Sequence, residues 1–492
     1  FDSWKEGKNH FLFGAAGTGK TFISLYLAMK SVLDLKSPYE KVVLVRVETS
    51  PEDIHGMKVA EGILTELGGM TSHAAVVARG MGVCAITGCG SLTIDYDAGT
   101  ATTREGVTVS RGDIITLDGN SAEVMLGDIP KTEARDSDDF QLLLNWADRY
   151  RRLKVRANAE TPEDAKKARE LGAEGVGLCR TEHMFFEESR VALMRGMILA
   201  DDAEERQTYL DSILEFHQAD MLSLFQIMDG LPVTIRLLDP PLHEFLPHLG
   251  ADVEHLAEQI GKSASSIAEA VDHLREVNPM LGLRGCRLSI VMPEVTEMQV
   301  NAIIGAAAQA IEMGLNPAPE IMIPLVINVR EVRLISEIID RGVHAALKDR
   351  SVSVRYKIGT MMETPRACLG ADRLAPAVEF MSFGTNDLTQ MTYGFSRDDS
   401  GKFVPQYLDK KIIESDPFVS LDQRAVGRLM ELAVKESRAR KSGIKYGICG
   451  EHGGDPRSIQ FCHDLGLDYV SCSPYRIPVA RIAAAQAAVR DS

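Results

Sequence analysis

The chain has 492 residues, 45% of them hydrophobic and 25% charged, the composition of a globular protein large enough for about three domains. Its 54 basic and 70 acidic residues give a formal net charge of −16, which argues against binding to nucleic acid. No apolar run approaches the ~18 residues of a membrane span, and there is no secretory signal, so we expect a cytoplasmic protein with no membrane partner. The 8 cysteines contain no C-x-x-C pair, so we expect reduced thiols.

Residues 1–42 predict a strand (HFLFG), a glycine-rich turn and a helix (FISLYLAMKSVLDL). The turn is a complete G-x(4)-G-K-T string, in which backbone amides, a lysine and a threonine hydroxyl can hold phosphates and Mg²⁺. Because a P-loop domain needs a larger parallel sheet, we favour a segment that donates a strand and a turn to the next domain over a working nucleotide site. The candidate nucleotide-binding residues are Gly14, Gly19, Lys20 and Thr21.

Residues 43–128 combine short β runs (VVLVRV, GVTVS, DIITL, AEVML) with many glycines, which predicts a compact α+β domain with β-hairpins. Within it, the string GGMTSHAAVVARG places His73 at the N-terminus of a predicted helix, where free amides and the helix dipole favour an anion. A neutral imidazole there can be phosphorylated, and a purely structural histidine is the alternative. Residues 129–152 predict a linker helix.

From residue 153 onward, eight apolar runs alternate with helical stretches. Buried parallel strands are continuous apolar runs, so the pattern predicts a (β/α)8 barrel over residues 153–492, with insertions around 190–275. An open doubly wound sheet is the alternative, but it needs a glycine-rich phosphate turn after its first strand, and VRANAETPED is not one. The runs are KVRANA, EGVGLCR, VTIRLLD, EIMIPLV, YKIGTMME, FMSFGTND, KYGICGE and DYVSCS.

Polar and reactive residues follow the C-terminal ends of five of these runs, where a TIM barrel carries its chemistry. We therefore expect them to meet at one mouth of the barrel. Arginines there can hold phosphate and carboxylate groups, and paired carboxylates suit Mg²⁺. The residues are Arg180, Arg236, Asp239, Glu363, Asn386, Asp387 and Cys449.

The string around His73 resembles the phosphohistidine loop of phosphoenolpyruvate (PEP)-utilising enzymes, and most of all that of pyruvate, phosphate dikinases. Further dikinase-like strings follow in order, so the resemblance covers residues 43–492, while residues 1–42 resemble the P-loop start of PhoH-like ATPases. It implies a swivelling phosphohistidine domain followed by a PEP/pyruvate barrel, and the family reaction ATP + pyruvate + phosphate = AMP + PEP + diphosphate. The strings are VRVETSPEDIHGM, GLCRTEHMFF, IRLLDPPLHEFLP, NPMLGLRGCRL, METPRA, SFGTNDLTQMTYGFSRDD, GICGEHGGDP and SCSPYRIPVAR.

The resemblance also implies a role for each matching residue. His73 would carry the phosphoryl group, Cys449 would protonate C3 of enolpyruvate, and Thr71 matches a threonine modified by a regulatory kinase. Asp239 would orient an arginine or a metal-bound water. Substrate binding is implied for Arg180, Arg236, Glu363, Gly384, Thr385, Asn386 and Asp387, and Mg²⁺ binding for Glu363 and Asp387.

The family's ATP-grasp domain has no match in these residues, so we expect the half-reaction between PEP plus His73 and pyruvate plus phospho-His73, with ATP acting through a missing or separate ATP-grasp domain. The resemblance further implies a homodimer, and a plastid location only if an upstream transit peptide was lost. The alternatives are a PEP synthase or phosphotransferase enzyme I-like protein, a P-loop ATPase of PhoH type, and an inactive partner chain.

Overall fold

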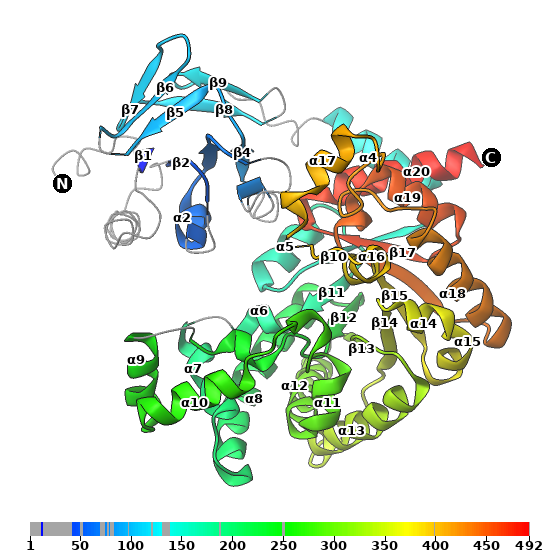
Figure 1. Ribbon diagram of the computed structural model, residues 1–492. Helices are drawn as coiled ribbons and strands as arrows, with labels where there is room; N and C mark the ends of the chain where they lie inside the picture. The colour runs from blue at the N-terminus through cyan, green and yellow to red at the C-terminus, as the bar shows by residue number, and fades with distance from the viewer. Residues whose placement is uncertain are drawn as a thin grey trace. The chain divides into compact units, whose positions relative to one another are not determined.

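The computed structural model divides the chain into two compact units, Phe1–Ser137 and Asp138–Ser492 (Figure 1). The predicted nucleotide turn at 14–21, the helix expected after it, and both Thr71 and His73 lie outside the described residues. The described residues are 11–12, 42–49, 53–68, 74–75, 78, 83–96, 98–119, 122–129, 138–185, 188–247, 251–397 and 399–491.

The first unit is built on a parallel sheet with strand order β1-β2-β3-β4 and helix α2 (Ile54–Val59). Successive strand residues face opposite sides, so Leu44 packs in one small core and Val45 in another. The β-hairpin structure expected for this region is confirmed by the antiparallel strands β5 to β7 and β8 to β9. The strands are β1 (Phe11–Leu12), β2 (Val43–Arg46), β3 (Gly62–Thr65), β4 (Cys84–Ile86), β5 (Leu92–Asp95), β6 (Thr100–Thr103), β7 (Thr108–Ser110), β8 (Ile115–Asp118) and β9 (Glu123–Leu126).

The second unit is a closed barrel of eight parallel strands in sequence order, which confirms the predicted (β/α)8 fold (Figure 1). Each of the eight apolar runs forms one strand, because its side chains are buried on both faces, against the helices and in the barrel interior. The strands are β10 (Lys154–Asn158), β11 (Val176–Arg180), β12 (Pro232–Arg236), β13 (Ala318–Ile323), β14 (Lys357–Met362), β15 (Phe380–Gly384), β16 (Lys445–Cys449) and β17 (Tyr469–Cys472).

Helices surround the barrel, and the predicted linker helix appears as α4, which begins at Asp138. Thr161 caps α5 with a hydroxyl and a reciprocal aspartate, and Asp202 caps α8, so local sequence sets where these helices begin. The helices are α4 (Asp138–Tyr150), α5 (Pro162–Glu170), α6 (Glu182–Phe185), α7 (Glu188–Ile198), α8 (Ala203–Ile227), α9 (Ala251–Ile260), α10 (Ala264–Leu274), α11 (Cys286–Val291), α12 (Pro293–Glu312), α13 (Val329–Leu347), α14 (Pro365–Leu369), α15 (Ala371–Leu374), α16 (Thr385–Tyr393), α17 (Val404–Asp409), α18 (Val426–Arg440), α19 (Pro456–Asp464) and α20 (Ile477–Arg490).

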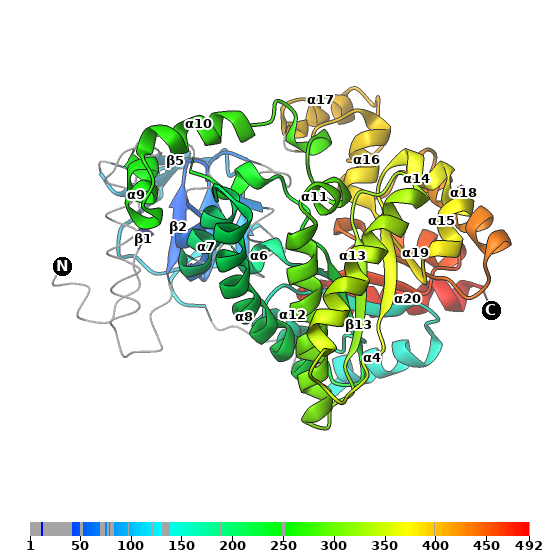
Figure 2. The same cartoon turned by 90° about the horizontal axis from the view of Figure 1, so that it is seen from below.

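The region predicted as an insertion, 190–275, is only partly separate from the barrel. Helix α8 belongs to two cores: Leu210 and Ile213 pack with α7, α9 and α10, whereas Leu224 and Phe225 pack in the barrel core. Figure 2 shows α7, α9 and α10 gathered on one side of the barrel. None of the helices in the described ranges is long and apolar enough to cross a bilayer.

Candidate active site

A cavity of about 290 Å³ lies at the carboxyl ends of the barrel strands, close to the lower end of the usual range for small-ligand pockets. All strands of a closed parallel barrel end at the same mouth, so residues far apart in sequence converge there. Thr385 is fully buried and does not line the cavity. The predicted site residues that do line it are Arg180, Arg236, Asp239, Glu363, Gly384, Asn386, Asp387 and Cys449.

Asp239 lies between two arginines. Its Oδ2 is 2.8 Å from Arg236 Nη1 and 2.6 Å from Arg284 Nη2. Burial acts to raise the pKa of Asp239, but the charges of the two guanidinium groups outweigh it and hold the pKa below its ordinary value. The carboxylate therefore stays ionised and fixes both arginines at the cavity.

Arg284 is a cavity residue that the sequence analysis did not single out. It precedes α11, whereas the sequence analysis looked for polar residues at the ends of apolar runs, so it was missed. Its place in the family-like string NPMLGLRGCRL was the signal that could have found it. Its Nη1 also lies 3.4 Å from Asp387 Oδ1. Arg284 thus bridges Asp239 and Asp387.

Two further acids neutralise the arginines at the ends of β11 and β12. Arg180 Nη1 donates to Glu160 Oε1 at 2.8 Å, and Arg236 Nη2 donates to Glu182 Oε1. Burial acts to lower the pKa of Arg180, but the charges of Glu160 and Glu182 and the hydrogen bond to Glu160 together outweigh it, so the pKa is raised. Both guanidinium groups remain fixed cations beside the cavity.

Glu363 and Asp387 form a pair of buried carboxylates with raised pKa values. Burial raises the pKa of each, and for Glu363 the charges of Asp387 and Asp239 raise it further. Glu363 Oε1 accepts a hydrogen bond from the Leu325 amide at 2.6 Å, while Oε2 has no partner among the described residues. A Cβ on Gly384 would lie 2.8 Å from that Oε2, so a larger residue there would crowd the oxygen. The Oε2 atom is a hard, unpaired oxygen of the kind that a divalent cation prefers.

Cys449 ends β16 in an apolar setting formed with Leu178, Met322, Met361 and Phe380. Burial raises the pKa of its thiol to about 11, although Ser382 Oγ donates to Sγ at 3.5 Å and opposes the shift. The group is therefore a protonated thiol at neutral pH. All eight cysteines of the chain are free.

Thr385 is held by His452 instead of facing the cavity. His452 Nε2 lies 2.9 Å from the Pro417 carbonyl and must donate to it, so Nδ1 accepts from the Thr385 hydroxyl at 2.7 Å. Burial lowers the pKa of His452 and keeps the ring neutral. This contact fixes the first turn of α16, which carries Asn386 and Asp387.

Four buried polar atoms of the cavity residues have no hydrogen-bond partner within the described ranges. Because buried polar groups are almost always paired, such a cluster indicates groups that await a ligand. Two are acceptors on carboxylates, one is an amide oxygen and one is a guanidinium donor. They are Glu182 Oε2, Glu363 Oε2, Asn386 Oδ1 and Arg236 Nε.

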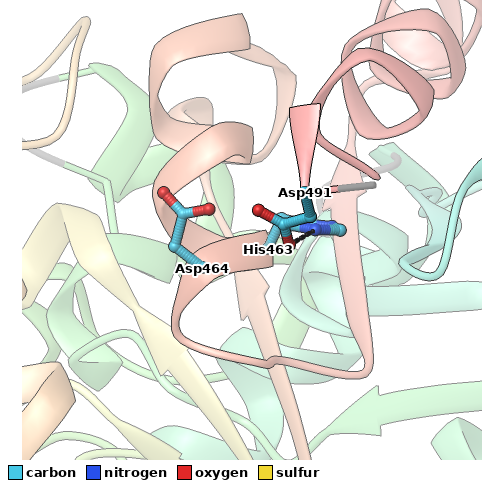
Figure 3. A group of neighbouring side chains, drawn as sticks. All are labelled: His463, Asp464 and Asp491. Carbon is cyan, nitrogen blue, oxygen red and sulfur yellow. Dashed lines mark hydrogen bonds and ion pairs between the residues drawn. The ribbon is translucent and has the colours of Figure 1, made fainter. Parts of the chain in front are cut away.

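A second group of possible metal ligands, His463, Asp464 and Asp491, lies outside this cavity (Figure 3). His463 Nε2 is 2.8 Å from Asp491 Oδ2, and the guanidinium of Arg152 contacts both side chains. The Arg152 guanidinium, itself 65% exposed, already neutralises the group, so we assign no metal to it.

Two family models match the chain: "PEP-utilising enzyme, mobile domain" over residues 38–122 and "PEP-utilising enzyme, PEP-binding domain" over residues 134–489. Curated relatives named pyruvate, phosphate dikinase are 52% identical in Clostridium symbiosum (92% of this chain, 52% of the relative) and in Rhizobium meliloti (96% and 52%). The chloroplastic protein of Arabidopsis thaliana is 52% identical over 91% of this chain and 47% of the relative. The chain spans about half the length of the curated relatives it matches.

Proposed function

The chain belongs to the family of PEP-utilising enzymes, and from this premise we propose that it transfers a phosphoryl group between PEP and His73, with pyruvate as the other product. This is the PEP half-reaction of a pyruvate, phosphate dikinase, and the 52% identity to enzymes of that name supports it. The observation that carries the proposal is the cluster of four unpartnered polar atoms in a cavity that also holds fixed arginines and a carboxylate pair. A small ligand with a phosphate, a carboxylate and a metal ion would satisfy such a cluster.

In the proposed reaction an imidazole nitrogen of His73 attacks the phosphorus of PEP. The bond between phosphorus and the C2 oxygen breaks, and its electron pair stays on that oxygen as an enolate. The guanidinium groups of Arg180 and Arg236 hold the phosphate and carboxylate of PEP, and the second also offers its unpaired Nε. Asp239 and Arg284 position these groups through their ion pairs.

Cys449 then completes the reaction as the acid. Its thiol donates a proton to C3 of the enolate, the C2 oxygen becomes a ketone, and pyruvate results. With a pKa of about 11, the thiol is almost fully protonated at neutral pH, as this role requires. Ser382 donates to the sulfur and stabilises the thiolate until it regains a proton from solvent.

Glu363 and Asp387 are the residues that we propose for Mg²⁺. Carboxylate oxygens are ligands that Mg²⁺ prefers, and the raised pKa values of the pair imply a proton that a divalent cation would displace. When bound, the ion would neutralise negative charge that develops on the enolate oxygen. Asn386 and the Gly384 backbone are proposed to contact the substrate.

Incubation of the full chain with radiolabelled PEP and Mg²⁺ tests the proposal. We expect an acid-labile label on His73 and release of pyruvate, with no label on the variant His73→Asn. An unlabelled wild-type protein, or an equal label on the variant, would overturn the assignment.

The role of Cys449 has its own test. The variant Cys449→Ala should still acquire the phosphoryl group but should lose the exchange of the C3 protons of pyruvate, measured in deuterated water. If the variant exchanges the C3 protons of pyruvate at the wild-type rate, another group is the acid.

Three finer parts of the proposal rest on the family resemblance. The first is a homodimer, which sedimentation of the full chain tests. The second is regulatory phosphorylation of Thr71, which peptide mass spectrometry tests. The third is an ATP-dependent step on an ATP-grasp domain, which is tested by asking whether a dikinase ATP-grasp protein phosphorylates His73. The eight free cysteines support a reducing compartment such as the cytoplasm.

A further inference from the structure

A second cavity, of about 470 Å³, lies at the opposite mouth of the barrel, where the strands begin. It shares no lining residue with the cavity at the carboxyl ends, and β16 connects the two, with Lys445 at its start and Cys449 at its end. Its charged lining contains one carboxylate, that of Asp468, whose Oδ2 accepts from the Tyr446 amide at 2.7 Å. The lining cations are Arg152, Lys154, Arg156 and Lys445.

Behind this lining, three cations lie near one buried carboxylate, that of Glu320. Glu320 lies 2.7 Å from Arg156 Nη1, with both side chains about 5% exposed or less, and 3.8 Å from Lys357 Nζ. Lys445 has no ion pair within the part of the chain that the structure describes. Glu320 and the lining Asp468 therefore provide two carboxylates for three cations, Arg156, Lys357 and Lys445.

The pKa of Lys445 agrees with this excess of cations over carboxylates. Burial lowers the pKa of its ammonium group, the charges of Lys357 and Arg156 lower it further, and Glu320 only partly opposes them. A lysine beside two other cations is stabilised by any anion that reaches it. The geometry of the cavity provides the space for one.

The outer wall adds cations whose partners are partly exposed to solvent. Arg152 pairs with Asp491, which is 48% exposed, and Lys154 pairs with Glu174. Exposed pairs contribute little and rearrange easily, so these cations can turn to a ligand. His463, which contacts Asp491 in Figure 3, lines the same cavity, and its buried Nδ1 has no partner among the described residues.

From this arrangement we propose that the cavity at the strand beginnings binds a small oxyanion with two or more negative charges, of the phosphate class. Lys445, Lys357 and the Arg156 guanidinium supply the inner positive charge, and Arg152 and Lys154 close over the ligand from outside. The alternative is that these charged side chains bind no ligand and only close the end of the barrel. The experiment below distinguishes a binding site from such a structural layer.

Competitive acetylation of the full chain, read by peptide mass spectrometry, tests the site at the residue concerned. Inorganic phosphate, diphosphate and glycerol phosphate serve as probes, each against sodium chloride of equal ionic strength. We expect diphosphate to slow acetylation of Lys445 several-fold while leaving Lys435, an exposed lysine on α18, unchanged. Stronger protection by glycerol phosphate than by either inorganic anion would identify a phosphomonoester as the ligand.

Substitutions at each mouth of the barrel show which residues the protection of Lys445 depends on. Lys357→Gln should weaken the affinity for diphosphate, read from the concentration that protects Lys445, by about tenfold, the usual contribution of one charged hydrogen bond, and Lys357→Arg should keep it. Arg236→Met, at the other mouth, should leave it unchanged. Protection that equals the sodium chloride control, or that disappears with Arg236→Met and persists with Lys357→Gln, would overturn the proposal.

Discussion

The two mouths of the barrel are built from the same eight strands but have charge imbalances of opposite sign. At the carboxyl ends, Glu363 and Asp387 have raised pKa values because both carboxyl groups are buried and because Asp239 is a further acid beside them. At the strand beginnings, Lys445 has a lowered pKa because it is partly buried and because the cations of Lys357 and Arg156 lie beside it. An acid that resists ionisation indicates a place for a cation, and a lysine that resists protonation indicates a place for an anion.

The comparison also separates two kinds of ion pair. Asp239 and its arginines at the carboxyl ends are almost fully buried, so each partner depends on the others for its charge. Arg152 and Asp491 at the other mouth are 65% and 48% exposed, and water can replace either partner. Substitutions at the first mouth should therefore have larger effects than equivalent substitutions at the second.

The largest expected effect is on activity. Arg236→Met removes a buried guanidinium that we place on the anionic substrate, so the rate of His73 labelling by PEP should fall about a thousandfold. Lys445→Gln, at the opposite mouth, should leave that rate within about twofold of wild type, as expected for a substitution remote from the reacting atoms. Equal losses in both variants would mean that the two mouths do not act separately.

A large effect on stability is expected at Asp239. Asp239→Asn keeps the shape of the side chain but leaves Arg236 and Arg284 as buried cations without their shared carboxylate, which should lower the free energy of unfolding by about 3–5 kcal/mol. The matched control Glu414→Gln, in an ion pair with Arg424 whose side chains are both more than 80% exposed, should cost about 0–1 kcal/mol. Urea denaturation of both variants measures the difference, and similar losses would contradict the distinction between buried and exposed pairs.

The sequence predicted the barrel well because buried parallel strands leave a long signal. Each run from KVRANA to DYVSCS is continuous and apolar, and helical stretches separate one run from the next. The first unit was harder to predict. The expected β runs there correspond to β2, β7, β8 and β9, whereas β3 to β6 were not anticipated, because sequences such as TATT or CAI give no clear alternation.

The site was predictable to the extent that its residues end strands. Arg180, Arg236 and Cys449 do so, and the structure brings them to one cavity. Arg284 reaches the same cavity from a segment outside the strands, and its role as a bridge between two acids depends on tertiary contacts that no local pattern contains. His73 lies in the part of the chain that the structure does not describe, so its role stays a prediction.

A moderate effect is expected from adding one methyl group at the carboxyl mouth. In Gly384→Ala the new Cβ would lie 2.8 Å from both Glu363 Oε2 and Met361 Sδ, and Glu363 cannot easily move because the Leu325 amide holds its other oxygen. We expect a loss of about 1–3 kcal/mol in the free energy of unfolding. Weaker stabilisation of the variant by Mg²⁺ should accompany it, measured by thermal unfolding.

Gly401→Ala is the matched control, because nothing lies within 4 Å of a Cβ built there. Its stability should stay within about 0.5 kcal/mol of the wild type. If Gly384→Ala behaved in the same way and responded fully to Mg²⁺, the Oε2 atom of Glu363 would not be the metal ligand.

The smallest effect on the free energy of unfolding is expected at Lys445. The direction in which that free energy changes with pH distinguishes the two mouths most sharply. The pKa of Lys445 is lower in the folded chain than in the unfolded one, so the folded protein releases this proton first and gains stability as pH rises through the interval between the two values. Solvent screening keeps the gain below about 0.5 kcal/mol. Lys445→Gln removes the repulsion, so it should be at least as stable as the wild type near neutral pH and should lack the rise in alkaline solution, as measured by urea denaturation at increasing pH. With diphosphate present, the wild type should be more stable than Lys445→Gln, because only the wild type retains the charge that holds the anion. If the variant is less stable than the wild type without the anion, Lys445 is already balanced by Glu320.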